Sequence, residues 1–306
     1  MVVLFPHDET APAVVTEQGV LGSSSMETSP DVFEQERGRL VGIAYGLLGS
    51  YSEAEDVVQE VWLRYHGSAQ EVREPEAWLT TVVTRIAIDR LRSAQKRRES
   101  YPGVWLPEPV SHLPSSETTQ INRSMLSIGF LHLLEKLSPE ERAVMVLREA
   151  FDRSHEEIGT ILGKSAAACR QLLSRARKQL RQERADRLGP VPRNVVQQCI
   201  DALMQGDEER LLGLLANDAI LYGDGGGRVP SVLNPIYGAE RIVRFFFGLL
   251  RKFPNHYRAS LTTVNSKPAM LILSGDRRSV MAMSFEGGRI TALHLVSNPE
   301  KLSAVK

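Results

Sequence analysis

Four acidic or amide side chains recur along one stripe of a helix predicted over residues 52–65, with Ser52 as its N-cap and Glu55 completing a capping box. Val57, Val61 and Tyr65 fall at helical spacing and give this helix an apolar face, away from the acidic stripe. Such a stripe is either an ordinary solvated face or a docking surface, because facing helices of complementary charge orient each other. The residues of the docking hypothesis are Glu53, Asp56, Gln59 and Glu60.

A second helix, predicted from Pro75 to about Arg92, leads into a strongly basic stretch. Proline suits a first helical turn, and between residues 85 and 98 six positive charges stand against Asp89. Arginine and lysine hold nucleic-acid phosphates without reading sequence. Trp78 fits either a core position or a wedge between bases, and both interpretations are kept. The phosphate-contact candidates are Arg85, Arg90, Arg92, Lys96 and Arg97.

A helix-turn-helix pattern follows further along the chain. Ser138 and the proline after it mark a helix start, and a short helix is predicted over His155–Leu162. Gly163 permits a tight turn, and Ser165 caps a longer helix. From residue 164 to 187 there are eight basic residues against two acidic ones. This one-signed charge beside a helix-turn-helix predicts DNA contact.

The first turns of the second helix in such a motif face the major groove. Arginine and glutamine can make paired hydrogen bonds to guanine and adenine there. For the alanines, helix propensity alone is the alternative explanation. The base-edge candidates are Ala166, Ala167, Arg170, Gln171 and Ser174, and the phosphate candidates further along are Arg175, Arg177 and Lys178.

The glycine run of Asp224-Gly225-Gly226-Gly227-Arg228 has more than one interpretation. A surface loop is the simple interpretation, and a phosphate cradle is disfavoured because no helix start with Lys-Ser/Thr follows. Close packing of the loop backbone on another part of the molecule explains the glycines better. Asp224, Tyr222, His256 and His294 could act as acid–base groups, but no catalytic motif accompanies them.

Composition limits the classes open to this chain. It has 306 residues, 37 basic and 37 acidic, and two cysteines. The cysteines exclude a disulfide scaffold and a cysteine zinc site and fit a reducing cytoplasm. No apolar run reaches about 18 residues, so no membrane helix is expected. The N-terminus does not follow the order of a signal peptide, and Met26 is an alternative to Met1 as the start.

Breaks in composition divide the chain into five predicted parts. Prolines at 102, 107, 109 and 114 mark a linker, and Gly189-Pro190-Val191-Pro192 breaks the chain again. The predicted parts are a mobile tail (1–28), a helical domain (29–98), the linker (99–120), a second helical domain (121–187) and a mixed helix and strand domain (188–306).

The ordered motifs resemble those of bacterial sigma factors. Asp56–Arg64 is similar to region 2.2, Glu76–Leu79 with Ala87–Arg92 to regions 2.3 and 2.4, and Leu137–Leu180 to region 4. Two such blocks joined by a linker, without regions 1.1 and 3, is the layout of extracytoplasmic-function sigma factors. Many members have Asn where this chain has Arg85, so no base-specific role is assigned to that position.

The resemblance implies roles for the surfaces above. The acidic stripe would bind the coiled coil of the RNA polymerase β′ subunit, the β flap of the polymerase core would be a further partner, and no cofactor or metal is expected. The first helical domain would bind the −10 promoter element and the helix-turn-helix the −35 element. A cytoplasmic protein, monomeric when free and not an enzyme, is expected.

Residues 193–303 resemble a SnoaL-like domain of the nuclear transport factor 2-like fold. The predicted fold is thus two all-α sigma domains followed by an α+β cone domain. In the subgroup with this fusion the domain adjusts sigma activity in cis, and the resemblance implies contacts with the sigma core. The residues of those contacts are Trp105, Pro107, Asp224, Gly225, Gly226, Gly227, Arg228, Asn298, Pro299 and Leu302.

Two alternatives remain open from the sequence. Trp105 is either an exposed docking element or buried within its own domain. The chain could also be a one-component regulator with a ligand-binding or isomerase-like C-terminal domain. Such a regulator would have no use for the Asp56–Glu60 surface, and a ligand in the C-terminal cavity is possible in either case.

Overall fold

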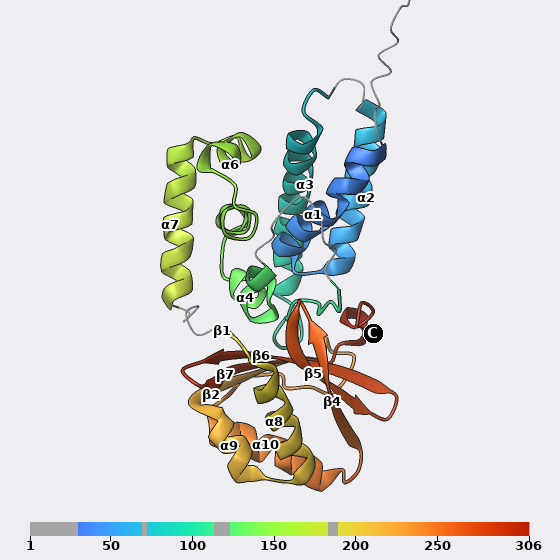
Figure 1. The fold of residues 1–306 in the computed structure, drawn as a ribbon, viewed down its shortest axis with the longest axis vertical. Helices are drawn as coiled ribbons and strands as arrows, with labels where there is room; N and C mark the ends of the chain where they lie inside the picture. The colour runs from blue at the N-terminus through green and yellow to red at the C-terminus, as the bar shows by residue number, and fades with distance from the viewer. Residues whose placement is uncertain (1–29, 69–71, 113–122, 183–188, 306) are drawn as a thin grey trace, which may run out of the picture.

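The computed structural model describes residues 30–68, 72–112, 123–182 and 189–305. The predicted N-terminal tail (1–28) and residues 113–120 of the predicted linker lie outside the described residues. Helices fill one half of the molecule and a curved sheet with three helices fills the other (Figure 1). No described helix has the length and apolar character needed to cross a membrane.

The first helical unit contains α1 (Pro30–Leu48), α2 (Tyr51–Ser68) and α3 (Pro75–Arg98). The predicted Ser52 cap is wrong. The helix starts one residue earlier, and Ser50 Oγ accepts from Glu53 N at 3.2 Å, because the carboxylate of Glu108, from the linker, holds the N–H groups of Tyr51 and Ser52. The α3 helix also continues six residues beyond the predicted end, so its basic residues are helical.

The second helical unit contains the predicted helix-turn-helix. Ser138 and Ser154 each form a capping box at the start of a helix, and Gly163 makes the turn with φ of 65°. Ser165 Oγ accepts from Ala168 N at 3.1 Å, as predicted for a cap. The elements are η2 (Arg123–Leu126), α4 (Ile128–Leu134), α5 (Pro139–Met145), a π-helical turn η3 (Val146–Ala150), α6 (His155–Leu162) and α7 (Ala166–Gln182).

The two helical units pack as one body. Their apolar residues form a continuous buried cluster that runs from Leu40 and Val57 to Leu134, Met145 and Leu173. The side chain of Val146 packs directly on the backbone of α1 at Gly46, where a Cβ would lie 2.8 Å from Val146 Cγ1. The helices that were predicted to bind two separate DNA elements are therefore held against each other in this structure.

The C-terminal half is an α+β domain, as predicted. In the described part of the chain its sheet has seven strands, in the order β3-β2-β7-β6-β5-β4 with β1 beside β6. The elements are β1 (Gly189–Pro190), α8 (Arg193–Gln205), α9 (Glu208–Leu214), β2 (Leu215–Asp224), β3 (Ile236–Tyr237), α10 (Ala239–Lys252), β4 (Tyr257–Val264), β5 (Lys267–Ser274), β6 (Arg277–Glu286), β7 (Arg289–Val296) and η5 (Pro299–Lys301).

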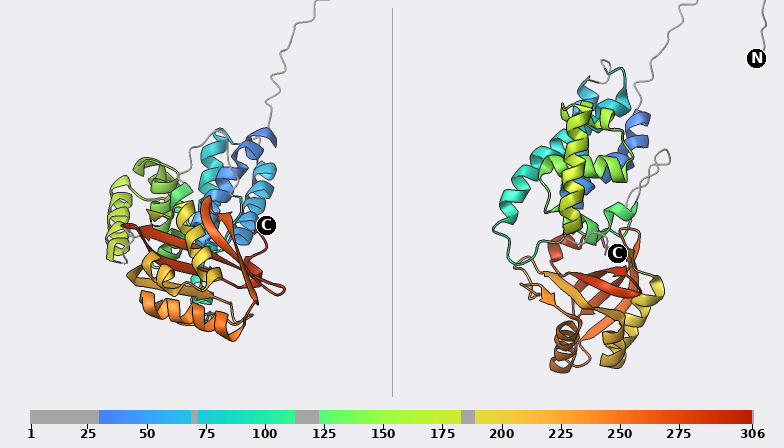
Figure 2. Two further views of the ribbon diagram at one scale, coloured as in Figure 1. Left: turned by 60° about the horizontal axis from the view of Figure 1, so that its bottom comes forward. Right: turned by 90° about the vertical axis from the view of Figure 1, so that its left-hand side faces the viewer.

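Both faces of this sheet are covered. Figures 1 and 2 show the sheet between the helical half and the helices α8, α9 and α10. Because side chains alternate along a strand, Met281 joins the core under the helices, whereas Val280 packs with Leu106 of the linker and Leu302. The linker is thus a packed layer against the sheet.

Candidate functional site

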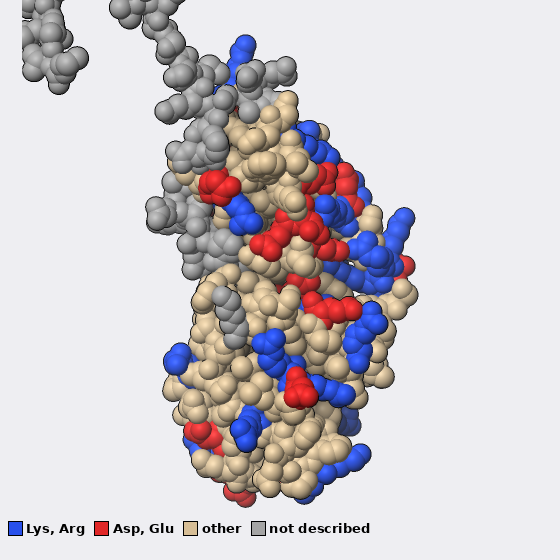
Figure 3. Space-filling view, turned by 90° about the vertical axis from the view of Figure 1, so that its right-hand side faces the viewer, with Lys and Arg blue, Asp and Glu red and all other residues tan. Residues whose placement is uncertain are grey.

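The acidic stripe lies on the side of α2 that faces away from its buried residues. Asp56 and Gln59 are exposed, and Glu53 and Glu60 are partly exposed, whereas Val57, Val58 and Val61 are buried. Figure 3 views the molecule from the side on which α2 lies and shows acidic and basic side chains gathered over the helical half. The stripe is accessible to a partner, as a docking surface requires.

Basic residues of α3 pair with this acidic stripe. Arg90 Nη2 donates to Glu60 Oε2 at 3.0 Å, and Arg90 Nη1 lies 4.0 Å from Asp56 Oδ2. Arg97 Nη2 donates to Glu53 Oε1 at 2.8 Å. Two sets of residues that the sequence predicts as separate surfaces are therefore adjacent. A partner for either set must replace these ion pairs with its own.

The rest of the predicted DNA-contacting residues of α3 vary in access. Arg85 Nε donates to the carbonyl oxygen of Ile161 in α6 at 3.1 Å, and Arg92 pairs with Glu140 of α5 at 2.7 Å. Lys96 is exposed. Trp78 is half-buried against the ring of Tyr65, at 5.9 Å between centroids, which fits the core interpretation better than a wedge. The α5 and α6 helices thus cover part of α3.

The predicted recognition helix α7 lies at the edge of the molecule (Figure 1). Its buried side holds Cys169, Leu172 and Ala176, so its base-edge candidates point outward. Ala166 is half-buried, and the exposed candidates are Ala167, Arg170, Gln171 and Ser174. A groove of about 860 Å³ runs along this helix and is basic, with Arg148, Arg170, Arg177, Lys178 and Arg181 in its lining.

Three of the basic residues on α7 pair with acidic residues of neighbouring helices. Arg170 lies 3.7 Å from Glu156 and Arg175 lies 3.6 Å from Glu141, and Arg177 Nε donates to Glu149 at 3.2 Å. These side chains are at least half exposed, so the pairs are easily exchanged. The surface is compatible with phosphate contact.

Segments far apart in the sequence converge at the boundary between the helical half and the sheet. We call Tyr101, Trp105, Asp224, Asn298 and Lys301 the junction cluster. Asp224 is fully buried. Its carboxylate accepts from Tyr101 Oη at 2.6 Å, Leu106 N at 2.9 Å, Lys301 Nζ at 2.7 Å and Gly226 N at 3.0 Å. It is therefore a central acceptor for the linker.

Lys301 is the cation of the junction cluster. Its ammonium group also donates to the carbonyl oxygen of Leu106 at 2.6 Å and lies 4.0 Å from the ring centroid of Trp105. Burial lowers the pKa of Lys301 to about 8, although Asp224 opposes that shift. The guanidinium of Arg98 lies over the same ring at 3.4 Å, so half-buried Trp105 contacts charges from both halves of the molecule.

The remaining contacts of the cluster fix the linker in place. Asn298 Nδ2 donates to Tyr101 Oη at 3.0 Å. Burial and the adjacent Asp224 raise the pKa of Tyr101, so its hydroxyl remains a donor. Pro107 is buried and Leu302 packs with Leu106, whereas Pro299 is exposed at the start of η5.

The glycine loop packs closely, on the linker as well as on the end of its own domain. Gly226 has φ of 61°, and a Cβ there would lie 2.3 Å from Asn298 Nδ2. A Cβ on Gly225 would lie 2.4 Å from Val229 O, and one on Gly227 would lie 3.0 Å from Pro102 Cγ. Any larger residue would push this loop away from the linker.

The expectation that Arg228 anchors the loop to the helical half is wrong. Arg228 is exposed and pairs with Glu300 of its own domain at 2.9 Å. Glu300 lies beside Arg228 because η5 packs against the loop, so its carboxylate takes the contact that the sequence assigned to another domain. Of the two charged residues of the loop, Asp224 contacts the linker and Arg228 does not.

Glu108, which the sequence analysis did not select, connects the linker to the acidic helix. Its Oε2 accepts from Tyr51 N at 2.8 Å and from Ser52 N at 3.1 Å, and its Oε1 accepts from Ser50 Oγ at 2.7 Å. A negative charge at a helix N-terminus is favourable. Leu106, two residues before, is bound to Asp224. The linker therefore joins the start of α2 directly to the junction cluster.

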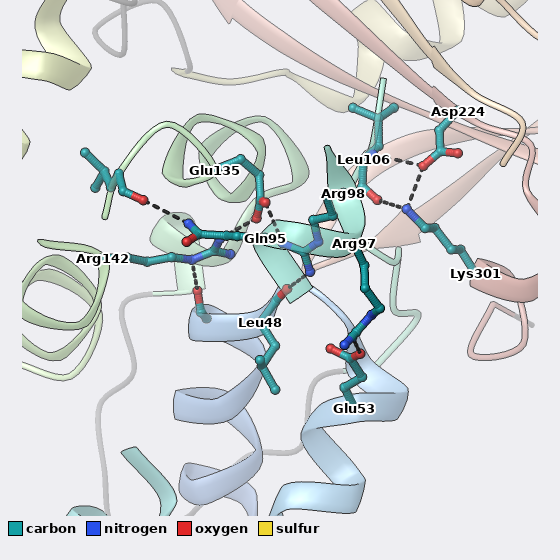
Figure 4. Close-up of polar contacts among 12 residues, drawn as sticks. Leu48, Glu53, Gln95, Arg97, Arg98, Leu106, Glu135, Arg142, Asp224 and Lys301 are labelled. Carbon is teal, nitrogen blue, oxygen red and sulfur yellow. Dashed lines mark hydrogen bonds and ion pairs between the residues drawn. The ribbon is translucent and has the colours of Figure 1, made fainter. Parts of the chain in front are cut away.

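A buried carboxylate also joins the two helical units. Glu135 accepts from Arg98 at 2.5 Å and from the fully buried Arg142 (Figure 4). Burial opposes its ionisation, yet Arg142 and Arg98 hold the pKa of Glu135 below its ordinary value. Arg98 also donates to the carbonyl oxygen of Leu48 at 2.7 Å, so one side chain at the end of α3 touches both units and the Trp105 ring.

Tyr222 and His294, two of the residues considered as acid–base groups, form a second contact between the sheet and the helical half. Tyr222 and His294 stack with ring centroids 5.3 Å apart, and His132 of α4 packs on both at 4.7 and 5.4 Å. Burial lowers the pKa of His132 to about 4 and that of His294 well below its ordinary value. These rings pack α4 against the sheet.

Comparison with known proteins identifies the helical half. The sigma-70 region 2 family matches residues 32–97 and the sigma-70 region 4 family matches residues 128–180. These residues include α2 with its acidic stripe, most of α3, and the helix-turn-helix. The class of protein is thus an RNA polymerase sigma factor.

Similarity over most of the chain identifies the family within this class. The ECF RNA polymerase sigma factor SigJ of Mycobacterium tuberculosis is 34% identical over 287 residues, which cover 89% of this chain and 92% of SigJ. The chain belongs to the extracytoplasmic-function RNA polymerase sigma factors. The probable ECF sigma factor SigI of the same organism is 30% identical over 280 residues, covering 88% of this chain and 93% of SigI.

The architecture also has a solved counterpart. The crystal structure of Mycobacterium tuberculosis SigJ superposes with a TM-score of 0.73 and 31% sequence identity, covering 90% of this chain and 99% of that one. The predicted layout, two helical sigma domains followed by a SnoaL-like α+β domain, is confirmed. The alternative of a one-component regulator is set aside, since such a protein has no need of region 2.

Proposed function

We propose that the acidic stripe of α2 binds the coiled coil of the polymerase β′ subunit and that α3 and α7 contact the −10 and −35 elements. The exposure of Asp56 and Gln59 and the basic groove along α7 support this assignment. The second helical unit would meet the β flap. The factor would act as a cytoplasmic monomer and without a cofactor.

We further propose that the C-terminal domain adjusts sigma activity in cis through the linker. The observation that supports this most directly is the double attachment of the linker. Glu108 holds the N-terminus of α2, and Leu106 is bound to Asp224 and Lys301. A change at the junction cluster would be transmitted through two residues to the helix that carries the acidic stripe.

The closed packing of the helical units would be the inactive arrangement. Arg85 and Arg92 of α3 are engaged by α6 and α5, and the ion pairs of Arg90 and Arg97 occupy the acidic stripe. Polymerase and promoter DNA would favour an open arrangement in which these contacts are exchanged. The attached C-terminal domain would bias the balance because its effective concentration is high.

A binding assay with core polymerase tests both proposals. Asp56→Arg with Glu60→Arg should abolish holoenzyme formation and leave the circular dichroism unchanged. Asp224→Ala should alter the affinity for core polymerase and the rate of initiation from a promoter selected in vitro. Retained polymerase binding by the charge-reversed protein would contradict the docking assignment.

The structure offers a matched control for the junction. Arg228→Ala changes a charged residue of the same loop that does not touch the linker, so it should leave both measurements unchanged. Tyr101→Phe removes one hydroxyl from the cluster and provides a milder variant if Asp224→Ala unfolds. Equal behaviour of wild type, Asp224→Ala and Tyr101→Phe would show that the domain has no role in cis.

We propose that the C-terminal domain is regulatory and not catalytic. Tyr222 and His294 are stacked against His132 of α4, and the carboxylate of Asp224 is fully engaged by the linker, Lys301 and its own loop. His256 is exposed at the start of β4. These residues are used for packing or lie apart from one another, so they do not form a common acid–base site.

A further inference from the structure

The C-terminal domain contains a cavity whose lining residues are distinct from those of the junction cluster. It lies between the ends of α8 and α10 and the face of strands β4 to β7 that these helices cover, with a volume of about 270 Å³. At roughly 30 Å³ for a water molecule, this is space for a small organic molecule. Its size is near the lower end of known ligand sites, which span roughly 300–1,000 Å³.

The inner part of this cavity is apolar. Phe245, Phe246 and Leu249 of α10 line one side, and Met270 and Ile272 of β5 line the other. In the strand register Met270 of β5 pairs with Met281 of β6, so the sheet surface next to this lining is apolar too. An apolar body would be bound here by removal of its surface from water.

The polar residues of the cavity are gathered at one end. The register places Tyr257, Ser274 and Arg277 side by side across β4, β5 and β6. Ser279 and Ser297 follow one row further in, joined by a hydrogen bond of 2.9 Å between their hydroxyls. A ligand in this cavity would therefore have its polar group at this end.

The charge at this polar end is positive. Among the described residues no acidic side chain lines the cavity, and no carboxylate lies in ion-pair range of Arg277. The next arginine, Arg278, points to the other face of the sheet, where it donates to the carbonyl oxygen of Val305 at 3.2 Å. Guanidinium groups bind carboxylates by paired, charge-assisted hydrogen bonds.

A buried donor also points to a missing polar partner. Ser231 is one of the lining residues, and its hydroxyl, which lies next to Gly223 at the edge of the cavity, is buried and has no hydrogen-bond partner in the described part of the chain. An unsatisfied buried polar group is unfavourable, and a carboxylate or hydroxyl oxygen in the cavity would satisfy it.

We propose that this cavity binds a small amphipathic carboxylic acid, with its hydrocarbon body among the α10 and β5 side chains and its carboxylate at Arg277. The cavity also touches the junction. Ser297 N donates to Asp224 O at 2.7 Å, and a Cβ on Gly223 would lie 3.0 Å from Ser231 Oγ and 2.7 Å from Val232 Cβ. A bound acid would therefore shift the backbone that carries Asp224, a step that rests on the proposed regulatory function.

Binding is tested on the full chain with octanoate as the probe and octanol as its uncharged counterpart. Displacement of anilinonaphthalene sulfonate fluorescence measures the affinity of each. Octanoate should bind at least about tenfold more tightly than octanol, which corresponds to one charge-assisted contact. Arg277→Gln should remove that difference, and Arg258→Gln, an exposed arginine of β4 outside the cavity, should keep it.

Two variants check that the probe occupies this cavity. Ala259→Phe fills it from β4, and Met204→Trp narrows it from the exposed end of α8 and carries less risk to the fold. Either should reduce octanoate affinity at least about tenfold. Equal affinity for octanoate and octanol, absence of displacement, or unchanged affinity in a folded Met204→Trp protein would overturn the site.

The link to the junction has its own measurement. With Trp62→Phe and Trp78→Phe, Trp105 is the remaining one of three tryptophans, and octanoate should shift its emission. Displacement of the dye without an emission shift would overturn the link and leave the binding site standing. Failure of the junction variants to alter transcription would contradict the regulatory function while octanoate still binds.

Discussion

Two groups of ion pairs in this molecule use the same chemistry in different surroundings. The pairs of Arg90 with Glu60 and Arg97 with Glu53 lie on the surface of α2 and α3, with side chains about one-third to two-thirds exposed. The pair of Asp224 with Lys301 is 0% and 7% exposed. The difference decides which contacts a partner can replace and which hold the molecule in one arrangement.

Water makes the surface pairs easy to exchange. An exposed ion pair contributes about 0–1 kcal/mol, so a polymerase helix or a DNA phosphate can take over either charge. In a buried pair, removal of one partner leaves an uncompensated charge and costs about 3–5 kcal/mol. The surface pairs are therefore suited to recognition and the junction cluster to fixing the linker.

The largest effect is expected from breaking the buried pair. Lys301→Met leaves Asp224 buried without its cation and should lower the free energy of unfolding by about 3–5 kcal/mol, measured by urea denaturation. The double variant Lys301→Met with Asp224→Asn should recover part of that loss, because both charges are gone while an amide oxygen still accepts hydrogen bonds from the linker. A double variant as unstable as the single one would show that packing, and not charge, governs the junction.

The packing of neutral His132 on Tyr222 and His294 gives a second test, because its contribution to stability should depend on pH. Burial lowers the pKa of His132 to about 4 from 6.5, so between these values the unfolded chain binds more protons than the folded one. Stability that is fully present above about pH 6.5 should fall as the pH drops to 4. His132→Phe should reduce that loss by about 3 kcal/mol, at ~1.4 kcal/mol per pH unit, in denaturation curves recorded across this range. Identical pH profiles would contradict the assignment.

An intermediate effect is expected at Glu108, which lies between the two groups. Glu108→Gln keeps the shape but removes the charge at the start of α2, and should destabilise the protein by about 0.5–2 kcal/mol, the range for helix caps. Thermal unfolding measures the change. Glu300→Gln, an exposed carboxylate that pairs with Arg228, is the control and should have a smaller effect.

The smallest effect is expected from the surface pairs. Arg97→Ala should change the free energy of unfolding by less than about 1 kcal/mol, and the difference from wild type should shrink further as salt is added. Urea denaturation at low and high ionic strength checks this. A loss comparable to that of Lys301→Met would remove the distinction between the two groups.

Features set by neighbouring residues could be predicted from the sequence. Ser138 and Ser165 cap their helices as expected, and the helix over His155–Leu162 has the predicted bounds, because capping and turn signals act within a few residues. The Ser52 cap failed because the side chain that fixes the start of α2 is Glu108, 56 residues away from Ser52. Local rules contain no information about such a partner.

The candidate site could be predicted only in part for the same reason. Trp105, Asp224 and Asn298, which were expected to contact the sigma core, do meet at the junction, but the residues that join them include Glu108, Lys301 and Tyr101, which were not selected. Charged residues between prolines or near a chain end look exposed in a sequence, and their burial depends on a sheet formed by distant strands. Arg228 was misplaced because Glu300, on the neighbouring turn, was not recognised as its partner.

The order in which the junction is synthesised follows from the contact between Lys301 and Leu106, which are 195 residues apart in the chain. Ribosomes add about 5–20 residues per second, so the first helical unit and the linker up to Leu106 emerge roughly 10–40 s before this lysine does. During that interval the apolar side of the linker has no sheet to cover it and the helix α2 has no restraint from the C-terminal domain. A nascent factor therefore lacks the contact proposed to restrain it until Lys301 has been synthesised.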